Sequence, residues 1–184
     1  MSENIPLSSS QNAFSVAVQA VVEELESADL SRIAQARETL RKLDRRDVLA
    51  EIKTNMFNED PEIRSLASEL LLLLNEESEA NEVISLLSDP VDFVRYNLIY
   101  YIIDYKYFPK IIVEPLINTL LRDPDSEVRI LSAIALGRIG DLRAVPALQK
   151  AKDNDFATDY EGETVSNVAT KAIKEILDKK GGNI

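Results

Sequence analysis

The chain repeats itself at a spacing of 34 residues, and this repeat restricts the possible folds more than any other feature. The segment RDPDSEVRILSAIALGRIGD (122–141) is echoed by SDPVDFVRYNLIYYIIDYKY (88–107). Both contain an Asp-Pro pair followed by a Val-Arg pair, and Asp123 follows Asp89 by 34 residues (123 − 89). Self-similarity at a period of about 20–50 residues indicates a stack of structural units, each burying its apolar face against its neighbours.

Weaker copies extend the repeat along the chain. They are NEDPEIRSLASELLLLLNEE (58–77), GETVSNVATKAIKEILD (162–178) and a degenerate copy at 31–43. Apolar residues recur at helical spacing in these segments and strand alternation is absent, which predicts an all-α fold of about ten helices. Each unit is predicted to hold two helices, and Asp-Pro opens the second. Aspartate caps free amide groups, proline fits the first turn, and Gly137 and Gly140 bracket the helix end in the clearest copy.

The repeat also predicts the domain boundaries. We expect a tail at 1–11, a single repeat domain at 12–180 and a second tail at 181–184. Repeat arrays need terminal caps, because an inner unit has no apolar core of its own. A first helix near 12–27 would cap one end, and a helix at 163–179 the other. The units between them are predicted at about 28–57, 58–87, 88–122 and 123–162.

The clearest units resemble the HEAT-like repeat, in the short form named after phycobilisome lyases. The matching residues are Asp123, Pro124, Val128, Arg129, Ala135, Leu136, Gly137, Ile139 and Gly140, followed by LRAVPAL (142–148). The match is strong over about 88–155 and weak over 30–87. The resemblance implies a right-handed α-α superhelix, a HEAT/armadillo-like solenoid. It also implies that the aspartates and arginines of successive units form a ladder, here Asp89, Arg95, Asp123 and Arg129.

Five of the six tyrosines lie within VRYNLIYYIIDYKYF (94–108). At 100° per residue, one sector of this helix matches the core positions of the repeat. That sector contains Val94, Leu98, Tyr101, Ile102 and Tyr105. The opposite sector contains Tyr96, Tyr100, Ile103 and Tyr107. The helix is therefore apolar all round, and such a helix is usually covered on every side.

The outward tyrosines are the main candidates for a functional surface. In HEAT-type solenoids the helix after the Asp-Pro turn lines the concave face, so the resemblance implies one patch in the groove. The predicted partner-binding residues are Tyr96, Tyr100, Ile103, Tyr107, Ile130, Ile134 and, at the polar end of the strip, Glu69. Tyrosine is enriched in binding hot spots. Two alternatives stay open: internal packing, including an N-terminal tail with Ile5 and Leu7 in the groove, and homodimerisation.

The charge distribution favours a basic protein partner. The formal net charge is −11, the wrong sign for a non-specific nucleic-acid binder. Nine carboxylates lie between Glu59 and Asp89 against the single Arg64, which would steer a basic partner or simply form a solvated face. A second acidic stretch at 152–163 lacks the spacing of an EF-hand calcium loop. We expect an exposed loop there, with Phe156 and Tyr160 packed on the last repeats.

The composition excludes much of enzyme chemistry. Cysteine and histidine are absent, so disulfides, thiolate chemistry, histidine-based triads and zinc sites are excluded. No glycine-rich phosphate loop is present. We therefore predict no catalytic residue, no cofactor and no metal. The N-terminus lacks the features of a signal peptide, and no apolar run approaches the ~20 residues of a membrane span, so we expect a cytoplasmic protein.

Together these features predict a non-catalytic module that binds a basic protein in its concave groove. The chain also resembles small bacterial HEAT-like proteins regarded as immunity or regulatory partners, and an acidic protein that covers a basic toxin would suit the charge. One alternative is a bilin lyase subunit or chaperone of the phycobilisome-lyase type, since a tyrosine-lined groove suits a flat conjugated ligand. The other is a structural homodimer.

Overall fold

The computed structural model of the chain describes residues 13–26, 31–74 and 77–181. The chain forms two compact units, 1–76 and 77–184. The single repeat domain at 12–180 stays a prediction. The predicted tail at 1–11 and nearly all of the tail at 181–184 lie outside the described residues. Each unit is described by itself below.

The described residues are helical, which confirms the all-α prediction and its ten α-helices. The α-helices are α1 (Val16–Glu26), α2 (Arg32–Lys42), α3 (Arg45–Asn55), α4 (Pro61–Leu74), α5 (Ala80–Ser85), α6 (Asp92–Asp104), α7 (Val113–Arg122), α8 (Ser126–Ile139), α9 (Val145–Asn154) and α10 (Val165–Gly181). Short 3-10 helices are η2 (Glu77–Glu79), η3 (Leu86–Ser88), η4 (Lys110–Ile112) and η5 (Leu142–Ala144). No β-strand occurs in the described ranges, where an isolated β-bridge joins Thr158 and Thr164. No described helix is long and apolar enough to span a membrane.

In the first unit, α4 packs against both α2 and α3, and α1 packs against α2. The apolar run of α4 is buried from Leu70 to Leu73, because its neighbours cover more than one face. Polar contacts fix the ends of the elements. Asp44 caps α3 by accepting from the backbone N–H groups of Arg46 and Asp47 at 3.0 and 3.1 Å.

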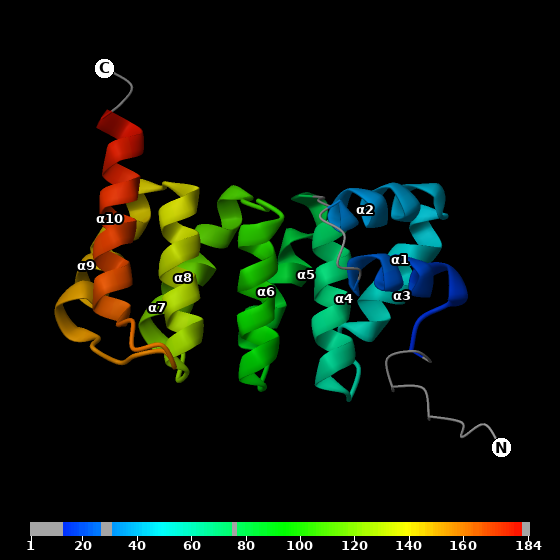
Figure 1. Cartoon of the computed structure of the whole chain (residues 1–184), viewed down its shortest axis with the longest axis horizontal. Helices are drawn as coiled ribbons and strands as arrows, with labels where there is room; N and C mark the ends of the chain where they lie inside the picture. The colour runs from blue at the N-terminus through cyan, green and yellow to red at the C-terminus, as the bar shows by residue number, and fades with distance from the viewer. Residues whose placement is uncertain (1–12, 27–30, 75–76, 182–184) are drawn as a thin grey trace. The chain divides into compact units, whose positions relative to one another are not determined.

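In the second unit the helices form two layers. Helices α6, α8 and α10 run side by side, with α8 in contact with both of the others, while α7 and α9 lie behind them (Figure 1). Helix α7 contacts α8, and α9 contacts α10, so α8 and α10 are each paired with the helix that precedes them. The interior is made of aliphatic side chains such as Leu98, Leu116, Leu136 and Leu148.

Gly137 allows α8 and α10 to approach each other closely. A Cβ atom at this position would lie 3.0 Å from both Cα and Cβ of Ala172. Gly137 is buried inside α8, whereas the sequence analysis places it at the helix end. The helix ends instead at Gly140, which adopts the left-handed conformation (φ 75°) and donates its N–H to the carbonyl of Leu136.

The Asp-Pro pair does not open α6 or α8, which corrects the sequence interpretation. Helix α8 begins at Ser126, and its cap is Asp125, which accepts from the N–H of Val128 at 3.0 Å. Helix α6 begins two residues after Pro90. Only α4 begins at the proline of its pair, Pro61. The side chains of the two later aspartates accept instead from the backbone N–H two residues on, Asp89 from Val91 at 2.9 Å and Asp123 from Asp125 at 3.0 Å.

Candidate functional site

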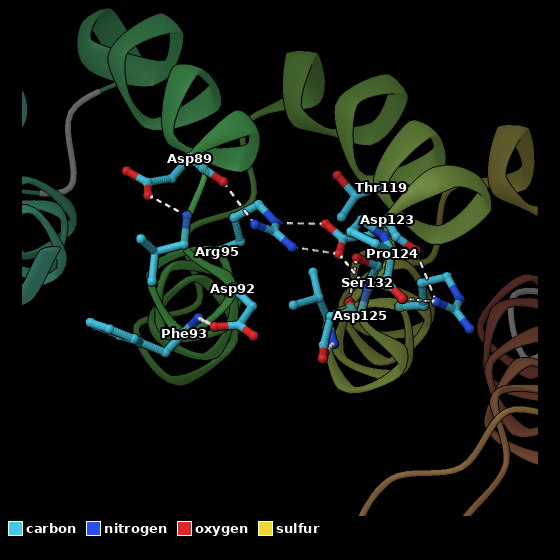
Figure 2. A network of polar contacts seen from close by, with 12 residues as sticks. Asp89, Asp92, Phe93, Arg95, Thr119, Asp123, Pro124, Asp125 and Ser132 are labelled. Atoms are coloured by element: carbon cyan, nitrogen blue, oxygen red, sulfur yellow. Dashed lines mark hydrogen bonds and ion pairs between the residues drawn. The ribbon is translucent and has the colours of Figure 1, made fainter.

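The aspartate of one repeat binds the arginine of the repeat before it. Arg95 donates through Nε to Oδ2 of Asp123 at 2.7 Å and through Nη2 to Oδ1 at 2.8 Å (Figure 2). Its Nη1 donates to the backbone carbonyl of Asp89 at 2.8 Å. Both side chains are buried, with 7% and 4% of their area exposed. The hydrogen bond to Asp123 raises the pKa of Arg95, against the opposing effect of burial.

We call each such arginine–aspartate pair between repeats a rung of the ladder. A second rung has the same geometry and uses an aspartate that the sequence analysis missed. Arg129 donates through Nε to Oδ2 of Asp155 at 2.7 Å, and its Nη1 donates to the carbonyl of Asp123 at 2.8 Å. The signal was present in the spacing, because Asp155 follows Asp123 by 32 residues (155 − 123), close to the repeat length. In the first unit Arg64 likewise donates to a carbonyl six residues earlier, that of Asn58. The two arginine–aspartate pairs join successive repeats and so stabilise the stack.

The face of α6 beside α8 carries the exposed aromatic surface. Tyr100 is 45% exposed, while Tyr96 and Ile103 are half-buried. Ile134 on α8 is also half-buried. We call these four residues the tyrosine face. Tyr100 contacts the ring of Tyr101 edge-on, with the ring centroids 5.9 Å apart, and Tyr101 stacks on Tyr105 at 6.0 Å.

Two predicted surface residues are buried and do not belong to this face. Tyr107 is 3% exposed and Ile130 is 6% exposed. Tyr107 lies beyond the end of α6, because Lys106 adopts a left-handed conformation (φ 54°) and turns the chain. Ile130 is one of the buried residues of α8.

Further corrections concern the covering of α6. Tyr101, predicted in the core, is half-buried, whereas Ile99 is fully buried. Phe93 is 38% exposed, so α6 is not covered on every side. Glu69 lies in α4 of the first unit and is half-buried. Its part in a binding surface remains a prediction.

The loop between α9 and α10, residues 155–164, adjoins the N-terminal end of α8. Ser126 Oγ donates to the carbonyl of Thr158 at 2.7 Å. Phe156 and Tyr160 are 66% and 83% exposed, so they do not pack on the last repeats as predicted. Polar contacts hold the loop instead.

Charge links this loop to the tyrosine face. Burial raises the pKa of Tyr96, and the carboxylates of Glu127, Asp159 and Glu161 raise it further. The pKa of Tyr160 is raised chiefly by Glu161, with Glu127 among the smaller causes. The same acidic groups therefore act on a tyrosine of α6 and on one of the loop.

Within the described residues, no group of three or more Asp or Glu side chains gathers as metal ligands would.

The chain was compared with models of known protein families. The family model described as HEAT repeats matches residues 108–174. The matched segment runs from just before η4 into α10 and contains two helix pairs, so this part of the chain is HEAT-like. A search of curated proteins found no matching sequence. HEAT repeats are generally modules for protein interaction.

Proposed function

We propose that the protein is a non-catalytic interaction module that binds a basic protein partner through the tyrosine face. The observation that carries the proposal is the exposure of Tyr100, beside the half-buried Tyr96, on a front helix of the stack. Tyrosine offers a large contact area with a polar tip and is enriched in binding hot spots. The similarity to HEAT repeats supports a binding role, since such stacks present extended surfaces to partners.

The net charge of −11 supports a basic partner, because opposite charge speeds encounter and disfavours acidic competitors. In this proposal the protein covers its partner and thereby inhibits or regulates it, as an immunity or regulatory protein does.

The proposal is tested by affinity capture from host extract with quantitative mass spectrometry. A protein retained by the wild type should be lost from a Tyr96→Ala, Tyr100→Ala variant. The matched control is Phe57→Ala, which removes an aromatic that is 79% exposed in the first unit. Equal recovery by the wild type and the tyrosine variant would show that the face does not bind the partner.

Two other outcomes would redirect the proposal. A shifted absorption band on adding bilin to the purified protein would favour the lyase or chaperone alternative. Sedimentation as a dimer that becomes monomeric in the tyrosine variant would identify the face as a contact between two copies of this chain.

A further inference from the structure

Polar contacts hold the loop at 155–164. The carboxylate of Asp155 accepts from Arg129 and that of Asp159 accepts from the backbone N–H groups of Glu161 and Glu163, each at 2.9 Å. The bridge between Thr158 and Thr164 closes its base. A loop held in this way loses little conformational entropy when a partner binds.

This ordered loop holds two aromatic side chains in solvent. Phe156 and Tyr160 expose most of their area, although the unit has apolar surfaces on which aromatic rings usually pack. Contiguous exposed apolar surface marks interaction sites more often than isolated exposed residues do. The loop that carries these two rings is bound to the start of α8, which packs against α6, the helix of Tyr96 and Tyr100.

The charges around these rings are negative. Glu127 follows Ser126 in the first turn of α8, where Ser126 Oγ donates to the carbonyl of Thr158 in the loop, and α8 packs against α6. Glu161 lies in the loop itself, and both carboxylates also contribute to the raised pKa of Tyr96 and of Tyr160. Two cationic side chains of this region are already engaged, since Arg129 binds Asp155 and Lys171 binds Glu163 at 2.6 Å. The surface therefore offers aromatic faces and carboxylates to a cation supplied from outside.

We propose that the loop and the tyrosine face together form a docking site for an extended, arginine- or lysine-bearing segment of the partner. Guanidinium and ammonium groups bind over tyrosine rings, and carboxylates beside the rings add charge-assisted hydrogen bonds. Charge complementarity selects this occupant, because an acidic segment or a nucleic acid would meet carboxylates of its own sign. The inference rests on the proposed function and names the chemistry that the same surface recognises.

The six tyrosines allow the site to be located directly in the full-length protein. The probe is a synthetic peptide in which arginine alternates with glycine, and the readout is the NMR signal of ring-labelled tyrosine. Binding should shift the signals of Tyr96, Tyr100 and Tyr160 and leave those of the buried Tyr105 and Tyr107 in place. A peptide with glutamine in place of arginine should shift none of them. Binding of the arginine peptide without shifts at the first three tyrosines would overturn the proposal.

A charge-matched pair of variants separates this site from general attraction to an acidic protein. Glu127→Gln with Glu161→Gln should weaken the affinity for the arginine peptide about threefold to tenfold, measured by fluorescence anisotropy at low salt. Glu23→Gln with Glu26→Gln on α1 removes the same charge from exposed positions of the first unit and should change the affinity less than twofold. Equal weakening by both pairs would overturn the proposal. Asp159 is left intact because it holds the loop.

The failure of this inference can be distinguished from the failure of the proposed function. If the Glu127→Gln, Glu161→Gln variant captures the cellular partner as well as the wild type does, while Tyr96→Ala, Tyr100→Ala loses it, the cationic docking site is refuted and the tyrosine face stands. If the glutamine variant loses the partner and high salt releases it from the wild type, the docking site is supported.

Discussion

The carboxylate of Asp123 receives three hydrogen bonds, two from the guanidinium of Arg95 and one from the backbone N–H of Asp125 at 3.0 Å. The residue therefore closes its own turn and joins it to the preceding repeat. Both ions of the pair are buried, and removing one partner would leave the other as an uncompensated charge in a poorly solvated place.

Asp123→Ala should consequently lower the free energy of unfolding by about 3–5 kcal/mol, measured by urea denaturation followed by circular dichroism. Glu163→Ala is the matched control, because it removes a carboxylate whose partner Lys171 is 68% exposed, and it should lower the free energy of unfolding far less. A loss of similar size in both variants would mean that burial does not strengthen the rung.

The ion pair of Asp141 with Arg143 at the surface contributes to stability in a way that depends on pH. Hydrogen bonds from the side chain and the backbone N–H of Arg143 lower the pKa of Asp141 from 3.8 to about 2. A lowered carboxyl pKa stabilises the folded state above the unfolded value, near pH 3.8, and this contribution is lost as the pH falls through about 2. Carboxyl-carbon NMR at pH 3 should find Asp141 mostly ionised in the folded wild type and clearly more protonated in Arg143→Ala, which loses the guanidinium but keeps the backbone N–H. An unchanged titration in the variant would show that the guanidinium does not cause the shift.

At the scale of elements, the end of α6 decides which tyrosines reach the surface. Lys106 donates its N–H to the carbonyl of Ile103, and Tyr107 donates its own to the carbonyl of Ile102. These two hydrogen bonds, together with the left-handed conformation of Lys106, form a Schellman motif. The motif turns the Tyr107 side chain inward. The sequence has lysine at this position, where glycine is usual. The helical phase was therefore extended one turn too far, and Tyr107 was wrongly assigned to the outward sector of the helix.

Lys106→Gly should stabilise the protein. A non-glycine residue in the left-handed region costs about 1–2 kcal/mol, while glycine loses roughly 0.5–1 kcal/mol of extra entropy on folding, so a gain of about 0.5–1 kcal/mol is expected. Lys110→Gly, at an exposed position without a positive φ, should instead lose about 0.5–1 kcal/mol. Urea denaturation of both variants measures the difference, and destabilisation by Lys106→Gly would contradict the strain argument.

The elements themselves were largely predictable, because each depends on local signals. The apolar periodicity predicts the helices, and Gly140 predicts the end of α8. The residues that were misplaced depend on contacts between elements. Ile130 and Gly137 are buried by neighbouring helices, and Phe156 and Tyr160 stay exposed because polar groups, rather than apolar packing, fix their loop. Helical phase on one segment carries no information about such neighbours.

At the scale of the whole molecule, the second unit contains within itself what a repeat stack needs. Both buried or half-buried rungs, Arg95 with Asp123 and Arg129 with Asp155, have both partners in this unit. The segment matched by the HEAT-repeat model also lies entirely inside it. In repeat proteins stability is approximately the sum of the stabilities of units and of the interfaces between neighbours, so a block of successive pairs folds without the remainder.

Residues 77–184 expressed alone should therefore be helical and unfold cooperatively on heating, as followed by circular dichroism. The same fragment carrying Asp123→Ala should melt at a clearly lower temperature, because the buried rung joins two successive repeats of the fragment. A loss of about 3–5 kcal/mol is a large part of the stability of a small domain. This variant separates native packing from residual helix, which would be insensitive to the ion pair. A fragment that is helical but melts without cooperativity, with or without Asp123, would show that the second unit does not fold independently.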